Sequence, residues 1–305
     1  MTLPRLTLPR PEILADLLGH PETPELLLDG GVLFAETDSG RICVRYPDGL
    51  LATFAVPGGR PYGCLFGSDD HVYVTQSGHD GQGRIAPRTV PPSLQRISPD
   101  GTAVEVLVTE ADGLAFTAPN SLAWDPDGRL WITDSGRWDP DGPGDPGYLY
   151  VIGPGLRAEV ALELGPTFPN GVLAESDGAV VWVESYTRRV CRLLPGGLTE
   201  HITTLPEGHT PEAVKADVDG NLWIANFEAG GIDVIARDGT PLHEVVLGGV
   251  PINFAFGEGE LYVIDFGLTE HENPYGYRPG QLKRVPCRTA GAPVLRGALD
   301  RAAVT

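Results

Sequence analysis

The chain has 305 residues, of which 41% are apolar, and a formal net charge of −19. Such an excess of acidic groups argues against nucleic acid and anionic membranes as partners, because both require a basic surface. No segment reaches the roughly 18 apolar residues of a membrane-spanning helix, so the sequence predicts no membrane anchor.

Residues 1–18 form an N-terminal extension that precedes the first repeated unit. The extension contains Arg5 and Arg10 but no continuous apolar run of the length that a signal peptide needs, so a cytoplasmic protein is the expectation. We expect the extension to pack across one face of the following domain or to close its last sheet. The tail from Gln281 to Thr305 is expected to supply strands to that final sheet.

An extended apolar segment carrying an aromatic residue recurs six times along the chain. The segments are Val32–Ala35, Val72–Val74, Leu130–Ile132, Val181–Val183, Leu222–Ile224 and Leu261–Val263. Their spacing is close to the period of a β-propeller blade, roughly 40 to 50 residues, with insertions in the second and third intervals. Beyond the first twenty residues no apolar stretch has the period of a helix. The sequence therefore predicts an all-β, six-bladed β-propeller that spans residues 1–305 as a single domain.

A proline-containing step precedes each aromatic segment and brings one distinctive residue. These residues are Glu22, Tyr62, Asn120, Asn170, Glu212 and, in a looser match, Asn253. Between the step and the aromatic segment, most units contain a turn such as Asp29-Gly30 or Asp127-Gly128, which is a strong hairpin signal. Because the first strand of every propeller blade lines the central channel, the six distinctive residues are predicted to form a ring there.

Two carboxylates and three carboxamides in one ring need polar partners, because unpaired polar groups are costly to bury. A hard cation would satisfy them, since calcium accepts six to eight oxygen ligands without a narrow geometry. We predict one divalent metal in the channel, with Ca²⁺ first and Mg²⁺, Mn²⁺ or Zn²⁺ as alternatives. The competing interpretation is that these side chains cap strand ends or bond to one another; Asn170, which precedes Gly171, also fits a turn.

Other sequence features carry weaker expectations. The insertions at residues 78–92 and 137–147 are rich in Gly and Pro and are expected to rim the channel mouth as a lid or specificity surface. The cysteines are far apart and lack a C-x-x-C pair, so we expect buried, reduced side chains: Cys43, Cys64, Cys191 and Cys287. No Gly-x-Ser-x-Gly elbow is present, which argues against a serine nucleophile.

Several motifs resemble the regucalcin/gluconolactonase family, also called the senescence marker protein family. They are Pro21-Glu22-Thr23-Pro24, Ala118-Pro119-Asn120, Phe168-Pro169-Asn170-Gly171 and Pro211-Glu212, followed by Asp219-Gly220-Asn221-Leu222-Trp223. The resemblance covers the first five units and implies a six-bladed propeller with one divalent metal, commonly a lactonase. It implies metal ligation by Glu22, Asn170 and Glu212, with Asn120 contacting substrate or a bound water.

The chain departs from the family pattern at several ring positions. Glu212-Ala213 replaces the usual Asp-Gly, Asn120-Ser121 replaces Asn-Asp, and Tyr62 replaces an asparagine; an arginine of animal members is Ala118 here. Tyr62 and Asn253 are expected to line the substrate pocket.

The expected reaction is hydrolysis of an aldonolactone or related cyclic ester, with the metal as Lewis acid and Glu212 as general base or as ligand only. His20 and His209 stand just ahead of ring carboxylates and are either proton shuttles or exposed loop residues. Two alternatives stay open: another carbonyl reaction at the same metal site, and a calcium-binding propeller without catalysis. A small-molecule substrate is the expected partner, with the protein a monomer or homodimer.

Overall fold

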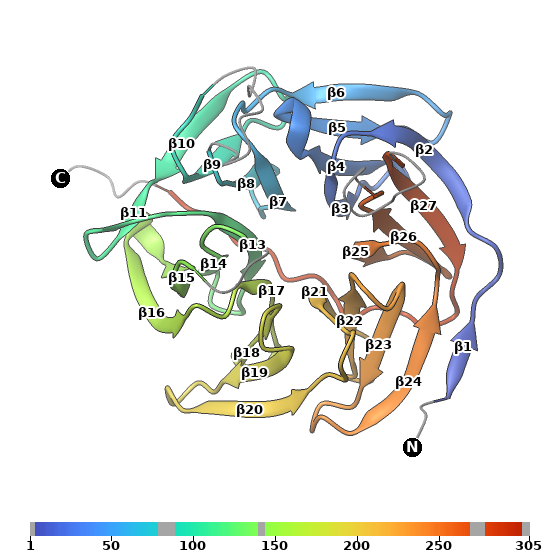
Figure 1. Cartoon of the computed structure of the whole chain (residues 1–305). Helices are drawn as coiled ribbons and strands as arrows, with labels where there is room; N and C mark the ends of the chain where they lie inside the picture. The colour runs from blue at the N-terminus through green and yellow to red at the C-terminus, as the bar shows by residue number, and fades with distance from the viewer. Residues whose placement is uncertain (1–3, 79–88, 140–143, 269–277, 301–305) are drawn as a thin grey trace.

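The computed structural model describes residues 4–78, 89–139, 144–268 and 278–300. Six antiparallel sheets surround a central axis (Figure 1), which confirms the predicted all-β, six-bladed propeller. Helical structure among the described residues is limited to two short 3₁₀ turns, Thr37–Ser39 and Pro154–Leu156. None of the described helical segments is long and apolar enough to cross a membrane.

Each of the first five blades contains four consecutive strands, the first of which lies innermost. Blade 1 holds β3 (Pro21–Leu26), β4 (Val32–Glu36), β5 (Arg41–Arg45) and β6 (Leu51–Ala55). Blade 2 holds β7 (Pro61–Phe66), β8 (Val72–Gln76), β9 (Ser93–Ile97) and β10 (Val104–Val108). Blade 3 holds β13 (Pro119–Trp124), β14 (Leu130–Asp134), β15 (Gly147–Ile152) and β16 (Ala158–Gly165). A small hairpin of β11 (Glu110–Ala111) and β12 (Leu114–Ala115) precedes it.

The remaining blades follow the same plan. Blade 4 holds β17 (Pro169–Ala174), β18 (Val180–Glu184), β19 (Arg189–Leu193) and β20 (Thr199–Thr204). Blade 5 holds β21 (Pro211–Ala216), β22 (Leu222–Asn226), β23 (Gly231–Ile235) and β24 (Pro241–Val246). Blade 6 holds β25 (Pro251–Phe256), β26 (Glu260–Asp265) and β27 (Gly280–Pro286).

The N-terminal extension completes the last two sheets. Strand β2 (Glu12–Leu18) pairs with β27 as the outermost strand of blade 6, so both ends of the chain build one sheet. Strand β1 (Arg5–Thr7) adds to β24 in parallel as a fifth strand of blade 5. Pairing of this kind removes exposed backbone edges, which otherwise promote association between molecules.

The C-terminal tail supplies a strand only up to Pro286. Residues 288–300, here called the C-terminal strap, cross the face of the propeller at which the inner strands end (Figure 1). The strap is anchored on blade 5 by Ala292 N, which donates to Ala216 O at 2.9 Å, and on blade 2 by Ser68 N, which donates to Gly297 O at 2.7 Å. The expectation that the whole tail forms strands was therefore wrong for its second half.

The core is divided into six clusters of buried side chains, one between each pair of neighbouring blades. The predicted aromatic segments are the second strands of the blades and feed these clusters. Their aromatics do not all occupy the same register, however. Phe34 and Trp182 pair with the fourth residue of the inner strand, as Trp182 with Val172, whereas Tyr73 pairs with the fifth, Leu65. Because side chains alternate across a strand, Phe34 and Trp182 pack toward the preceding blade.

Two smaller predictions about the fold are confirmed. The four cysteines are free and buried, and three of them belong to β-strands. The Asp-Gly pairs form tight turns: Gly30 and Gly128 have φ of 86° and 76°, which only glycine adopts readily. In each turn the glycine N–H donates to the carbonyl three residues earlier, Leu27 O and Asp125 O, at 3.0 Å.

Candidate metal and substrate site

The start of each inner strand is fixed by a hydroxyl group from the preceding blade. Thr37 Oγ1 donates to Pro61 O, Ser135 Oγ to Pro169 O and Ser185 Oγ to Pro211 O, each at 2.7 Å. Each hydroxyl follows the last residue of a second strand. The proline steps found in the sequence are thus joined blade to blade, and the residues next to them are held at one end of the propeller axis.

Blades 4 and 5 approach each other unusually closely beside two of the predicted ligands. A Cβ atom at Gly171 would lie 2.5 Å from Glu212 O and 2.6 Å from Val214 N, so only glycine fits there. This approach brings Asn170 to Glu212, and Asn170 Nδ2 donates to Glu212 Oε2 at 2.6 Å. The Asn-Gly pair therefore serves close packing of two inner strands and is not part of a turn.

Glu22 and Glu212 are two buried carboxylates within electrostatic reach of each other. Burial raises the pKa of Glu22 to about 8, and the nearby Arg60 guanidinium partly opposes this rise. Burial also raises the pKa of Glu212 to about 8; the charge of Glu22 raises it further, and the Asn170 hydrogen bond lowers it. Burying two like charges together is unfavourable unless a cation or proton compensates them.

The donor set fits a hard cation. Asn170 Nδ2 donates to Ser185 Oγ at 3.3 Å as well as to Glu212, which leaves its Oδ1 as an acceptor beside the two carboxylates. Carboxylate and amide oxygens are the ligands that calcium and magnesium prefer. Among the residues that the structure describes, no group of three or more His, Cys, Asp or Glu side chains is arranged for a metal. The candidate set has two carboxylates and one amide, completed by water.

The other three predicted ring residues differ in their surroundings. Asn120 Nδ2 donates to Ser135 Oγ at 3.0 Å, the hydroxyl that also bonds to the Pro169 carbonyl next to Asn170. Tyr62 is partly buried, and its pKa is raised by burial. Asn253 lies one position further along its inner strand, because the partner of Pro251 is Asp265 and that of Asn253 is Ile264. Its Nδ2 donates to Thr23 Oγ1 at 3.2 Å, so its amide joins blades 6 and 1.

His20 and Arg60 are close to Glu22 in ways that the motifs did not indicate. His20 Nε2 lies 3.1 Å from Glu22 Oε1, and His20 Nδ1 lies 3.2 Å from an Arg60 terminal nitrogen. The imidazole stands edge-on to the rings of Tyr62 and Phe266, with centroids 5.5 and 4.5 Å apart. His20 is therefore part of the site and not an exposed loop residue. The one available signal for Arg60 was its place two residues before Tyr62, in the proline step.

His209 lies in a different environment. Its Nδ1 is 3.0 Å from Asp233 Oδ2, and Asn226 Nδ2 also donates to that carboxylate at 2.7 Å. These contacts connect the loop ahead of β21 to the second and third strands of blade 5. His209 thus anchors the loop that leads to Glu212. Of the insertions expected at the mouth, residues 79–88 and 140–143 lie outside the described part of the chain.

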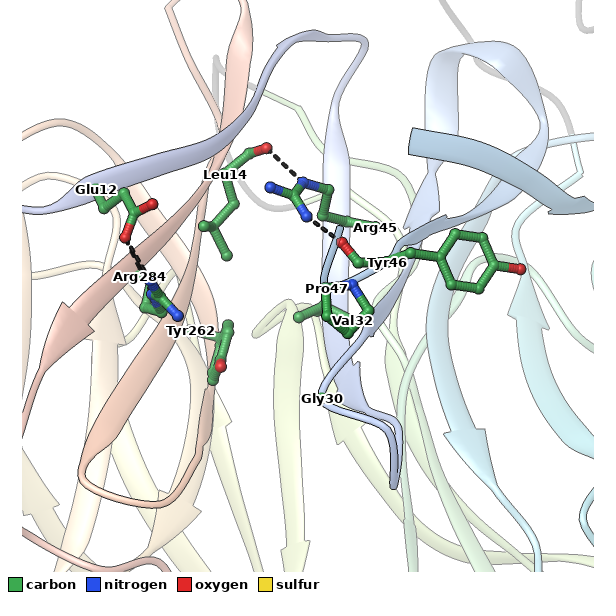
Figure 2. Close-up of a pocket in the computed structure, with 9 residues that line it drawn as sticks. All are labelled: Glu12, Leu14, Gly30, Val32, Arg45, Tyr46, Pro47, Tyr262 and Arg284. Atoms are coloured by element: carbon green, nitrogen blue, oxygen red, sulfur yellow. Dashed lines mark hydrogen bonds and ion pairs between the residues drawn. The ribbon is translucent and has the colours of Figure 1, made fainter. Parts of the chain in front are cut away.

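A cavity of about 140 Å³ lies elsewhere, where the outer strand β2 meets the hairpins of blade 1. Figure 2 shows that its charged groups are mutually satisfied: Glu12 pairs with Arg284 at 2.6 Å, and Arg45 Nε donates to Leu14 O at 2.9 Å. Arg45 also donates to the carbonyl of Tyr46. None of the predicted ring residues lines this cavity. Its contacts connect the closing strand to blade 1.

Comparison with known proteins agrees with this geometry. The model of the SMP-30/Gluconolactonase/LRE-like region matches residues 83–265. A strictosidine synthase-like protein 6 of Arabidopsis thaliana is 28% identical over 225 residues, 68% of this chain and 57% of that protein. A virginiamycin B lyase of Nocardia farcinica is 28% identical over 187 residues, 61% of this chain and 59% of that protein. The chain thus spans less than two thirds of the length of these relatives.

Among solved structures, a calcium-binding regucalcin from Agrobacterium tumefaciens superimposes with a TM-score of 0.78 at 17% identity. The superposition covers 97% of this chain and 99% of that one, which is a likeness of fold. The family model, in contrast, matches more than half of the sequence, in agreement with the motifs around Asn120, Asn170 and Glu212. The chain belongs to the SMP-30/gluconolactonase/LRE-like family.

Proposed function

We propose that this protein is a divalent-metal-dependent hydrolase of a lactone or related cyclic ester. The observation that carries the proposal is the buried pair Glu22 and Glu212 with Asn170 hydrogen-bonded between blades 4 and 5. Membership of the gluconolactonase-like family supports lactone chemistry. Glu22, Asn170 and Glu212 would hold the cation, most favourably Ca²⁺ given the hard oxygen donors. When bound, the cation would supply Lewis-acid polarisation of the substrate carbonyl.

The residues of the chain then have separate tasks. Asn120, fixed by Ser135, orients the substrate or a water next to Asn170. Glu212 removes a proton from the attacking water, whose oxygen forms the new bond to the ring carbonyl carbon. The ring C–O bond breaks, and the proton passes to the departing alkoxide, so the product is a hydroxy acid. Burial, which raises the pKa of Glu212, makes it a stronger base than an exposed glutamate.

The test removes divalent metal with a chelator and restores Ca²⁺, Mg²⁺, Mn²⁺ or Zn²⁺ singly while acid release from a panel of lactones is followed. We expect activity to return with at least one metal and Glu22→Gln to lower kcat/KM by about 100-fold or more. Glu25→Gln is the matched control, because Glu25 is a buried glutamate on the same strand that belongs to no part of the proposed site. Absence of turnover with every metal, while Glu22→Gln abolishes metal binding, would refute the hydrolase.

A second candidate is another ring-opening or carbonyl reaction at the same site. Two observations favour it: Tyr62 and Ser121 depart from the family pattern, and the relatives include a virginiamycin B lyase and strictosidine synthase-like proteins. Metal-dependent consumption of a cyclic ester without uptake of water would distinguish it, since mass spectrometry in ¹⁸O-labelled water detects no label in the product. Metal binding without any turnover would instead favour the non-catalytic calcium-binding propeller.

A further inference from the structure

An aromatic cluster made of Trp138, Phe168 and Tyr186 lies directly beside the Asn120 and Asn170 half of the site. Trp138 stacks on Tyr186, with centroids 4.7 Å apart and planes at 25°, and stands edge-on to Phe168 at 4.9 Å. Phe168 and Tyr186 are themselves 5.4 Å apart. Phe168 precedes the Pro169-Asn170 step of blade 4, and Tyr186 follows the end of β18. Trp138 comes from the connection after β14.

The same hydroxyl groups that hold the predicted site also place this cluster. Ser135, which bonds to Asn120, lies three residues before Trp138, and Ser185, which bonds to Asn170, lies immediately before Tyr186. Ser185 N donates to the carbonyl of Phe168 at 3.0 Å. All three aromatics therefore leave the strands at the end of the axis where the candidate metal ligands lie. The cluster is continuous with the site.

The cluster presents an aromatic ring to solvent instead of burying it. Trp138 is 52% exposed and is the one aromatic among the described residues with a large exposed apolar side chain. Its exposed position is fixed, because Asp139 N donates to Tyr186 Oη at 2.8 Å and Tyr186 Oη donates to Asp139 O at 3.1 Å. A side chain held in this way is typical of a binding surface, since a fixed aromatic loses little entropy when a ligand stacks on it.

We infer that Trp138, supported by Phe168 and Tyr186, binds a planar apolar ring carried by the substrate. The inference rests on the proposed function and narrows its substrate class to aryl-substituted or aryl-fused lactones. Both hydrogen-bonding roles of the Tyr186 hydroxyl are already used by Asp139, so that hydroxyl is not available to the hydroxyl groups of a sugar lactone. A second aromatic group, Tyr62 with Phe266 around His20, borders the Glu22 half of the site.

Iodide quenching of tryptophan fluorescence tests this inference without any need for turnover. Trp124, Trp131, Trp182 and Trp223 are each at most 6% exposed, so Trp138 is the tryptophan that iodide reaches in the native protein. The probes are the lactam analogue of dihydrocoumarin, which resists hydrolysis, and glucono-δ-lactone. We expect the aryl lactam to protect Trp138 from iodide and glucono-δ-lactone to give no protection. Equal protection by the sugar lactone would overturn the apolar substrate class.

Variants extend the test to affinity. Trp138→Ala is expected to weaken binding of the aryl lactam, followed by calorimetry, about tenfold or more, whereas Trp138→Phe stays within about threefold because it keeps a ring. Leu198→Ala is the matched control, since Leu198 is an exposed apolar residue on the outer hairpin of blade 4. Unchanged affinity in Trp138→Ala would refute the inference. Tight, Trp138-dependent binding without hydrolysis under any metal would uphold it and refute the proposed hydrolase instead.

Discussion

Glu212 combines a buried negative charge with one hydrogen-bond donor, Asn170, and a second carboxylate nearby. In the absence of a cation, protonation is the cheapest way to relieve this arrangement, which is why the pKa of Glu212 is raised to about 8. A raised carboxyl pKa means that the folded state binds a proton more tightly than the unfolded state. The corresponding stability is present below the ordinary value of 4.5 and is lost as pH rises through about 8.

Glu212→Gln should therefore change stability in opposite directions with and without metal. In chelator at pH 8 we expect the variant to melt at least about 2 °C above the wild type, because a neutral amide replaces a buried charge. At pH 5 the two proteins should melt within about 1 °C of each other. With saturating Ca²⁺ at pH 8 the order should reverse, because only the wild type gains binding energy. Circular dichroism melting curves measure all three comparisons.

Glu25→Gln is again the informative control, since burial raises the pKa of Glu25 to about 7 but Glu25 lies outside the ligand set. Its melting temperature should respond to pH in the same sense and not to Ca²⁺. A difference between Glu212→Gln and the wild type that is the same at pH 5 and pH 8 would contradict the assignment of a buried, proton-binding carboxylate.

At this scale the sequence predicts some residues of the site well and others not at all. Glu22 and Glu212 stand out because each follows a proline at the same place in its repeat, and Asn170 is identified in the same way. Asn253 misleads because the proline step of blade 6 is followed first by an isoleucine. Arg60 reaches the site through a side chain whose direction depends on the tertiary fold, which no local pattern encodes.

Among the elements, the contact between β17 and β21 decides the geometry of the site. Gly171→Ala would force a methyl group into the backbone of Glu212 and Val214, which can only separate the two strands. We expect a loss of about 1–3 kcal/mol of unfolding free energy. Metal affinity should fall at the same time, because Asn170 and Glu212 are no longer held together. Urea unfolding and calcium titration calorimetry measure the two effects.

Gly196→Ala provides the matched comparison within blade 4. No atom lies within 4 Å of the position that its Cβ would take, so the substitution should leave stability within about 0.5 kcal/mol and calcium binding unchanged. If Gly171→Ala behaved in the same way as Gly196→Ala, the close approach of the two strands would not be what holds the ligands together.

The strands themselves could be predicted because short apolar runs between Asp-Gly turns are a local signal. The faces on which their aromatics lie could not. Phe34 and Trp182 are one residue out of phase with Tyr73 and Trp131, and each phase is compatible with a buried strand because both faces of a blade are covered by neighbours. The clusters between blades, and not the repeat, decide which phase packs.

On the scale of the whole molecule, the C-terminal strap joins blades that are distant in sequence. Leu299 is fully buried in the cluster between blades 2 and 3, its N–H donates to Tyr73 Oη at 2.9 Å, and its carbonyl accepts from Arg96 at 2.9 Å. Arg296 of the strap lies over the Phe66 ring, 5.5 Å from its centroid, and its charge lowers the pKa of Glu25 against the effect of burial.

Leu299→Ala should accordingly destabilise the entire propeller and not the strap alone. We expect a loss of about 2–5 kcal/mol in a single unfolding transition, because the cavity opens between two blades. Val294→Ala, at an exposed position of the same strap, should change stability by less than about 0.5 kcal/mol. Chemical denaturation followed by tryptophan fluorescence distinguishes the two. An early transition confined to Leu299→Ala would show that the strap detaches independently.

The pairing of β2 with β27 has a consequence for how the protein is made. Synthesis starts at the N-terminus, so the strand that completes blade 6 is produced first and its partner nearly last. During elongation, Ala15 and Leu18 lack the sheet that later buries them, and the growing assembly keeps an open side with unpaired edges. Ring closure is therefore a late event of biosynthesis, and the nascent chain is most exposed to aggregation in the interval before it.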